Sequence, residues 1–266
     1  MWFARAAGRE KEYGVKHAVA WWCLERAGLT LTRAIDVCCD LGYGGLELVE
    51  PADWRQVREA GLTIVSARGH ESLEDGLNRR ENHDRIEREI RANLALAVEW
   101  RIPVLICFSG NRNGLDDETG LAATAEGLRR VAREAEEAGV TLALELLNSK
   151  VNHPDYQCDR TAWGVRVCEA VGSPRVKLLY DIYHMQVMEG DIIRTIGAQH
   201  ASFGHYHTAG NPGRHEIDDR QELNYPAIIR AIAATGYDGW LGQEFVPAGE
   251  PVAALRDALA RCQVPG

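Results

Sequence analysis

The sequence predicts an α/β protein that folds as a single (β/α)8 barrel, the fold also known as a TIM barrel. Three observations lead to this prediction. Short apolar runs alternate with longer amphipathic stretches along the chain, which is typical of strand–helix units and a parallel sheet. The alternation repeats eight times, the number that closes such a barrel, and no linker or low-complexity stretch divides the 266 residues.

Eight strands and eight helices are expected in alternation. Strand-like runs lie at residues 18–22, 46–49, 63–66, 104–108, 141–146, 176–180, 201–207 and 239–244. Helical stretches lie at residues 32–41, 51–61, 82–100, 121–138, 161–171, 191–196, 226–235 and 252–261. Their ends carry ordinary signals: Pro51 stands in the first turn of the second helix, Gly61 closes that same helix, and Gly42 and Gly139 close two others.

A doubly wound sheet is the alternative to this organisation. A doubly wound sheet rarely needs eight regular units, and no Gly-x-Gly-x-x-Gly sequence follows the first strand. Residues 1–15 fit neither a strand nor a helix pattern. We therefore expect an N-terminal extension at residues 1–15, packed on the outside or on a neighbouring subunit, and a barrel at residues 16–266.

Composition excludes several classes of protein. A formal net charge of -9 disfavours nucleic acid as a partner. No apolar run approaches the roughly 20 residues of a membrane span, and the first residues lack the apolar core of a signal peptide, which predicts a cytoplasmic protein without a membrane partner. Seven cysteines without a Cys-x-x-Cys pair indicate reduced, buried thiols.

Four consecutive predicted strands end in polar residues: Glu145, Asp181, His207 and Glu244. A single such carboxylate is more often a helix cap or one member of an ion pair. In a barrel, however, the carboxyl ends of these strands converge on one mouth. Three carboxylates that close would repel one another unless a cation lay among them. Three oxygen ligands and one imidazole favour a divalent ion such as Mn²⁺, Mg²⁺ or Co²⁺ over a structural Zn²⁺.

Further candidates surround these four residues. His184 follows Asp181 by three residues, and Arg214 lies on a glycine-rich loop after the seventh strand, where its planar fork suits a carboxylate or phosphate. Helix capping and surface solvation are the respective alternatives.

Aromatic residues and two more histidines complete the set of candidates. Strand alternation points either Trp21 or Trp22 into the barrel, where Trp21 is our candidate for an apolar wall under a sugar. For each tryptophan, a place in the apolar core is the alternative. His70 is a further candidate for substrate binding, with a plain loop histidine as the alternative. His205 lines the interior or orients a metal ligand.

The residues from about 141 to 247 resemble the hydroxypyruvate isomerase family within the xylose isomerase-like TIM-barrel superfamily. The first half matches only in outline. The resemblance is carried by Leu-Glu-Leu-Leu-Asn around Glu145, Tyr-Asp-Ile-Tyr-His at 180–184, His-Tyr-His-Thr-Ala-Gly at 205–210, Pro-Gly-Arg-His-Glu at 212–216, Glu-Leu-Asn-Tyr-Pro at 222–226 and Gly-Tyr-Asp-Gly-Trp-Leu-Gly-Gln-Glu at 236–244.

This resemblance implies that one metal ion is held by the four strand-end residues and that Glu145 and Glu244 also act as acid and base on opposite sides of the substrate. His184 and Arg214 are then expected to bind substrate. One position departs from the pattern, since the family usually has glutamine where His207 stands and the related ketose 3-epimerases have histidine. The resemblance also implies a homodimer or homotetramer.

The resulting hypothesis is a metal-dependent isomerase that moves a proton through an enediolate in a small oxo-hydroxy sugar or sugar acid. Arg214 favours a carboxylate such as hydroxypyruvate. The alternatives are a ketose 3-epimerase, a keto-sugar or inosose dehydratase, and a barrel that binds a sugar without converting it. An abasic-site endonuclease is disfavoured, because its three-metal cluster needs more histidines than these strand ends offer.

Overall fold

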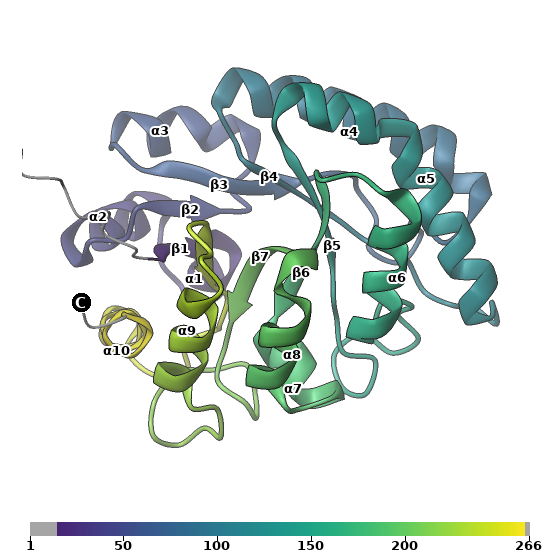
Figure 1. The fold of residues 1–266 in the computed structure, drawn as a ribbon. Coiled ribbons are helices and arrows are strands. Elements are labelled where there is room, and N and C mark those ends of the chain that lie inside the picture. The colour runs from purple at the N-terminus through teal and green to yellow at the C-terminus, as the bar shows by residue number, and fades with distance from the viewer. Residues whose placement is uncertain (1–14, 264–266) are drawn as a thin grey trace, which may run out of the picture.

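The computed structural model describes residues 15–263. Eight parallel strands close into a barrel in chain order, and β8 is hydrogen-bonded to β1. Figure 1 shows how the strands and helices are arranged. The predicted fold class is thereby confirmed. The expected N-terminal extension lies outside the described residues except for Val15, which is buried.

Each strand is followed by at least one helix, as expected. The strands are β1 (Lys16–Ala20), β2 (Gly45–Glu47), β3 (Thr63–Arg68), β4 (Val104–Cys107), β5 (Thr141–Glu145), β6 (Val176–Asp181), β7 (Phe203–Thr208) and β8 (Trp240–Gln243). The α-helices are α1 (Trp21–Arg26), α2 (Leu31–Leu41), α3 (Trp54–Glu59), α4 (His83–Trp100), α5 (Asp117–Ala138), α6 (Thr161–Val171), α7 (Ile182–Met188), α8 (Ile192–Gln199), α9 (Tyr225–Ala234) and α10 (Pro251–Cys262). Of these, α1 and α7 are additional to the eight expected helices.

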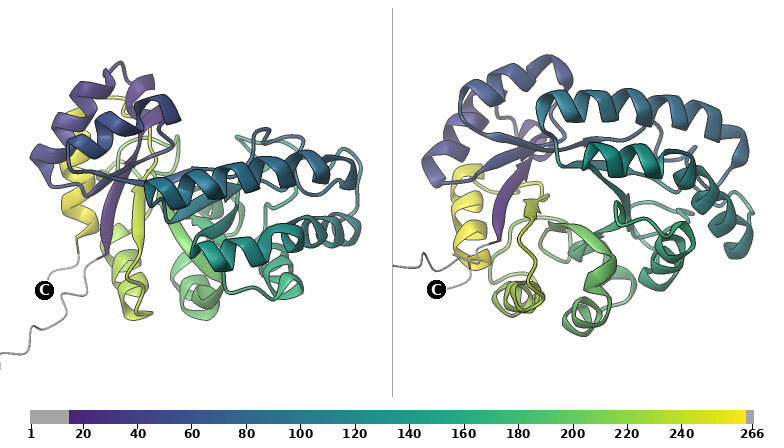
Figure 2. Two further views of the ribbon diagram at one scale, coloured as in Figure 1. Left: turned by 90° about the horizontal axis from the view of Figure 1, so that it is seen from above. Right: turned by 45° about the horizontal axis from the view of Figure 1, so that its top comes forward.

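The helices surround the strands on the outside (Figure 2). Local sequence explains where several of them begin and end. Asp116 accepts a hydrogen bond from the backbone N–H of Thr119 at the start of α5, and Gly139 closes that helix with a φ of 69°. Within the described residues, no helix is long and apolar enough to cross a membrane.

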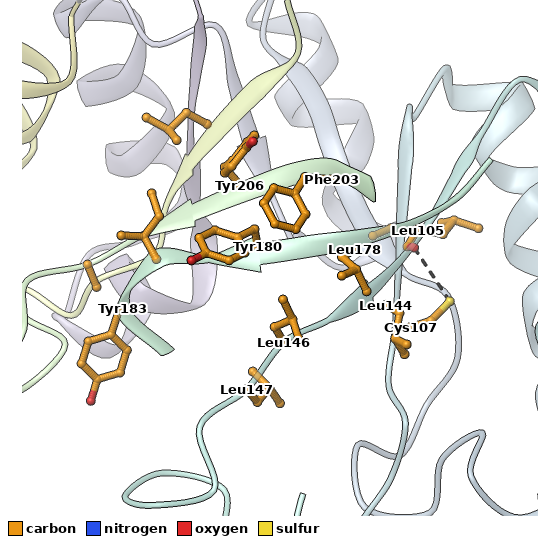
Figure 3. Packing of buried hydrophobic residues seen from close by; sticks show 14 of the residues in the cluster. Leu105, Cys107, Leu144, Leu146, Leu147, Leu178, Tyr180, Tyr183, Phe203 and Tyr206 are labelled. Carbon is orange, nitrogen blue, oxygen red and sulfur yellow. Dashed lines mark hydrogen bonds between the residues drawn. The ribbon is translucent and has the colours of Figure 1, made fainter. Parts of the chain in front are cut away.

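Two apolar layers hold the barrel together, because successive residues of a strand point to opposite faces of the sheet. The small inner cluster consists of Val104, Ile106, Ala143 and Leu179. Alternate residues of the same strands, such as Leu105, Leu144 and Leu178, belong to the large cluster between strands and helices (Figure 3). There, Tyr180 of β6 stacks on Phe203 of β7 with ring centroids 4.5 Å apart. All seven cysteines are free, and only Cys39 among them is exposed.

The first predicted strand needs a correction. We expected a strand at residues 18–22, but β1 ends at Ala20 and both tryptophans, Trp21 and Trp22, begin α1. Aromatic residues favour strands, and here the tertiary context overrides that preference. Strand alternation therefore does not decide which tryptophan faces the barrel interior. The seven-residue helix α7 was also missed, since it is too short to give a periodic signal.

Candidate metal centre

The four strand-end residues meet at the mouth of the barrel. Glu145 ends β5, Asp181 ends β6, His207 lies in β7, and Glu244 directly follows β8. One ligand atom from each lies within 4.8 Å of those of the other three, and all four side chains are buried. Register explains this convergence, since Asp181 pairs with His207 across neighbouring strands.

The donor set fits a divalent cation. Oδ1 of Asp181 accepts a 2.9 Å hydrogen bond from the backbone N–H of His184 and thereby caps α7. Oδ2 is buried and has no hydrogen-bond partner among the described residues. A buried carboxylate oxygen without a hydrogen bond is costly, even with Arg214 3.7 Å away, and a cation beside it would remove that cost. Three carboxylates and one imidazole are ligands that Mn²⁺, Mg²⁺ and Co²⁺ accept.

Glu244 is surrounded by donors. Its Oε1 accepts a hydrogen bond from Nε1 of Trp22 at 2.9 Å. Its Oε2 lies 2.5 Å from Nη2 of Arg214 and 2.9 Å from Nδ1 of His207. Burial by itself raises the pKa of Glu244, but Arg214 and His207 outweigh burial and hold that pKa well below its ordinary value. Glu244 is therefore a carboxylate at neutral pH.

Glu145 lies in the opposite environment. Its carboxyl group accepts no hydrogen bond from any described residue, and Oε1 lies 3.8 Å from Nδ1 of His207. Burial, together with repulsion from Glu244, raises the pKa of Glu145 to about 8. Burial likewise raises the pKa of Asp181 to about 6, although Arg214 opposes that rise.

Arg214 reaches this cluster from the loop between β7 and α9. Its backbone has a φ of 59°, a conformation that non-glycine residues rarely adopt. Two hydrogen bonds hold it there: its N–H donates to the carbonyl of Gly210, and its carbonyl accepts from the N–H of Val246, both at 2.9 Å. Its guanidinium lies over the rings of Trp22 and Tyr183, with centroid distances of 5.3 and 5.8 Å.

His184 is a neutral hydrogen-bond donor. Its Nδ1 accepts from the backbone N–H of Asn148 at 3.1 Å. A backbone amide can only donate, so the proton of the neutral ring is on Nε2. Burial, aided by Arg214, lowers the pKa of His184 well below its ordinary value. Nε2 has no hydrogen-bond partner among the described residues and lies 3.8 Å from Oδ2 of Asp181.

A cavity of about 600 Å³ opens beside the cluster. It has both apolar and polar walls. Its lining residues are Trp22, Arg26, Leu48, Arg68, Glu71, Ser72, Leu73, Phe108, Glu145, Leu147, Asn152, His153, Arg214 and Glu244. Glu145, Glu244 and Arg214 thus face a space that suits a small ligand.

Two predicted binding residues lie elsewhere. Trp21 packs into the apolar core and does not line the cavity, whereas its neighbour Trp22 does. His70 is fully buried, and its Nε2 accepts a hydrogen bond from the backbone N–H of Phe108 at 2.9 Å. The structure therefore brings His184 and Arg214 to the four strand-end residues, but not Trp21 or His70.

Sequence reasoning missed Glu47 at the end of β2. This residue is fully buried, and its Oε2 lies 3.1 Å from Nε2 of His207. The signal was present, since Glu47 interrupts the apolar run of the second predicted strand. Burial lowers the pKa of His207, but Glu244 and Glu47 outweigh burial and raise that pKa well above its ordinary value.

Comparisons with known proteins agree with this architecture. The chain is 37% identical over 134 residues to the 2-oxo-tetronate isomerase of Cupriavidus necator, which covers 50% of this chain and 51% of that protein. It is 30% identical over 175 residues to the hydroxypyruvate isomerase of Escherichia coli, covering 64% and 67% respectively. The match thus spans about half the length of the first relative and about two thirds of the second.

One solved structure and one family model agree with the TIM-barrel fold. The crystal structure of an AP endonuclease, family 2, from Brucella melitensis superposes with a TM-score of 0.81 at 26% identity, over 91% of this chain and 96% of that one. The model of the family described as xylose isomerase-like TIM barrel matches residues 31–262. Because this match takes in most of the sequence, the chain belongs to the xylose isomerase-like TIM barrel family.

Proposed function

We propose that the protein is a metal-dependent isomerase that interconverts a small oxo-hydroxy acid or sugar by moving a proton between adjacent carbons through an enediolate. One observation carries this proposal. Glu145 and Glu244 come from β5 and β8, face the same cavity, and belong to the same cluster of potential metal ligands. The two named isomerases to which the chain is similar support the same class of reaction.

The reaction begins with a carbon acid next to a carbonyl group, which is too weak for an unaided carboxylate. When a divalent ion is held by the four strand-end residues, it supplies positive charge near the oxygen on which negative charge develops. One glutamate takes the proton from the first carbon, and the other returns a proton to its neighbour. Trp22 and Arg214 hold Glu244 in a defined orientation for this transfer.

His184 has a role that its hydrogen bonds define. Because Nδ1 accepts from Asn148, the Nε2–H is the group that remains for a substrate oxygen, although the buried ring of His184 does not itself line the cavity. A neutral imidazole donor can stabilise a developing oxyanion without itself adding a full charge to the site. The apolar side chains of Leu48, Phe108 and Leu147 in the cavity wall would limit the access of water to the reacting atoms.

The substrate class follows from the cavity. Arg214 lines it beside the two glutamates, and its guanidinium favours a substrate with a carboxylate. The proposed substrate is a compound of three to six carbons, and hydroxypyruvate is the first candidate. A ketose 3-epimerase is the second candidate, because His207 is the residue that the ketose 3-epimerase pattern has at this position. Mn²⁺, Mg²⁺ and Co²⁺ are the proposed ions.

The test is deuterium incorporation from D₂O, followed by NMR, into hydroxypyruvate, 2-oxo-tetronates and ketoses, with Mn²⁺ or with EDTA. We expect exchange that requires the metal and falls by about 10²–10⁴-fold in Glu145→Gln and in Glu244→Gln. Glu50→Gln is the control, since Glu50 lies at the same end of the barrel but does not line the cavity. The exchanging carbon separates an isomerase from an epimerase, and a metal-loaded protein that exchanges no substrate would reject the proposal.

A further inference from the structure

Glu47 is a fully buried carboxylate next to the metal centre, and the proposed chemistry does not use it. It is 0% exposed. Its Oε2 accepts hydrogen bonds from Oγ of Ser66 at 2.6 Å and meets Nε2 of His205 at 2.9 Å and Nε2 of His207 at 3.1 Å. Its Oε1 is buried and has no hydrogen-bond partner among the described residues.

The chemistry of these contacts places protons on both imidazoles. A carboxylate oxygen can only accept, so His205 and His207 each donate from Nε2. The other nitrogen of His207, Nδ1, lies on the far side of the ring. Without a cation it donates to Oε2 of Glu244 at 2.9 Å, and it lies 3.8 Å from Oε1 of Glu145. Both glutamates are members of the metal cluster, and a bound ion would replace the proton on Nδ1. His207 therefore has one nitrogen for Glu47 and one for the cation.

We propose that Glu47 is a positioning residue, which keeps the proton of His207 on Nε2 and so presents Nδ1 to the metal ion. A carboxylate behind a metal-bound histidine fixes the orientation of the ring and makes the nitrogen a stronger ligand. The inference concerns the metal site on which the proposed function rests, but it makes no use of a substrate.

Strand β8, next to β7, leaves room for the contact between Glu47 and His207. Gly242 of β8 lies opposite His207 in the sheet register. A Cβ atom on Gly242 would stand 2.2 Å from Oε1 of Glu47 and 2.7 Å from Cδ2 of His207. Any side chain at this position would push the two residues out of place, so the contact depends on three strands, β2, β7 and β8.

A second cation is the rival explanation. Glu47, His205 and His207 each offer an atom within 4.8 Å of those of the other two, which is close enough for a metal ion. In that arrangement His207 would bridge two ions, and neither Nε2 would carry a proton. The number of ions bound per chain therefore separates the two explanations.

The experiment is a titration of the metal-free protein with Mn²⁺, in which free Mn²⁺ is measured by EPR without any substrate. We expect wild type to bind one ion and Glu47→Gln to bind it about 10–100-fold more weakly. His205→Gln, which leaves the contact between Glu47 and His207 in place, is the matched control and should stay within about threefold of wild type. Gly242→Ala should weaken binding in the same direction as Glu47→Gln.

An NMR measurement on wild type keeps the inference testable if the variants do not fold. In the Mg²⁺-loaded protein, imidazole-selective ¹⁵N spectra should show a proton on Nε2 of His207 and none on Nδ1. A proton on Nδ1, two Mn²⁺ ions per chain, or unchanged affinity in Glu47→Gln would each overturn the inference. None of these results depends on turnover, so an inactive protein that still gives the expected titration would reject only the proposed isomerase. Failure of wild type to bind Mn²⁺, Mg²⁺ or Co²⁺ would reject both.

Discussion

The β5 side and the β8 side of the mouth carry the same side chain in opposite environments. Glu145 and Glu244 are buried to a similar extent, with 5% and 4% of their surfaces exposed. Glu244 receives hydrogen bonds from Trp22, Arg214 and His207, whereas the carboxyl of Glu145 receives none from the described residues. The pKa of Glu244 is accordingly lowered, whereas that of Glu145 is raised to about 8.

This difference shows what each level of structure contributes. The barrel delivers both glutamates to one mouth, because both stand at the carboxyl ends of parallel strands. Their charge states are decided by groups from other elements, namely α1 for Trp22 and the loop after β7 for Arg214. Two carboxyl groups whose pKa values are pushed apart by their surroundings are a common basis for acid and base roles.

The largest expected effect comes from removing the positive charge of Arg214 on the β8 side of the mouth. Arg214→Leu leaves Glu244 and Asp181 without their buried counter-charge. We expect the metal-free variant to lose about 3–5 kcal/mol of unfolding free energy, as is usual when one partner of a buried ion pair is removed. Added Mn²⁺ should restore part of this loss. Urea denaturation with EDTA and with Mn²⁺ measures both effects.

The matched change on the β5 side is Glu145→Gln. It neutralises a carboxyl group that has no hydrogen-bond donor among the described residues, so the metal-free variant should be at least as stable as wild type at pH 8. Equal losses of stability in Arg214→Leu and Glu145→Gln would contradict the contrast between the two sides.

Much of the site was predictable because it follows from topology. Once eight strand–helix units predict a barrel, polar residues at the ends of consecutive strands must meet, whatever their separation in sequence. Glu145, Asp181, His207 and Glu244 met this condition, and the structure brings them together as a group.

The misplaced predictions depend on details that topology does not determine. The choice between Trp21 and Trp22 depends on the residue at which β1 gives way to α1, and boundaries are the least certain part of a prediction. His70 is withdrawn from the cavity because its ring accepts a hydrogen bond from Phe108. Glu47 was overlooked because its partners, Ser66 and His205, come from two other strands.

A pH series sharpens the contrast between the two glutamates. The pKa of Glu145 is raised to about 8 in the folded, metal-free protein, above the ordinary value of about 4.3 expected when the chain unfolds. The folded state then binds more protons than the unfolded state between these values. The contribution of Glu145 to stability is therefore complete at low pH and is lost as the pH rises through about 8.

The measurement is the melting temperature from pH 6 to pH 9 in EDTA, for wild type and Glu145→Gln. We expect wild type to lose several degrees relative to the variant over this range, since about 1 kcal/mol shifts the melting temperature of a domain by a few degrees. Parallel curves would show that Glu145 ionises normally. Saturating Mn²⁺ should abolish the difference in slope, because a cation favours the ionised carboxyl group.

The smallest expected effect tests the hydrogen bond from the uncharged indole of Trp22 to Glu244. Trp22→Phe removes the Nε1–H that donates to Oε1, while the ring that packs against Arg214 remains aromatic. A hydrogen bond to a charged group contributes about 1.5–3 kcal/mol, so we expect kcat/KM for the exchange reaction to fall by about 10–100-fold. Steady-state exchange rates with saturating Mn²⁺ provide the measurement.

Trp21→Phe is the matched control on the adjacent residue. Trp21 lies in the apolar core and does not line the cavity, so this variant should lower the unfolding free energy by about 1 kcal/mol and leave kcat/KM within about threefold of wild type. The reverse pattern would mean that Trp21 faces the substrate. In that case the predicted strand at residues 18–22 would describe this part of the chain better than a helix that begins at Trp21. Trp22 would then not donate to Glu244, and the hydrogen bond that distinguishes Glu244 from Glu145 would be absent.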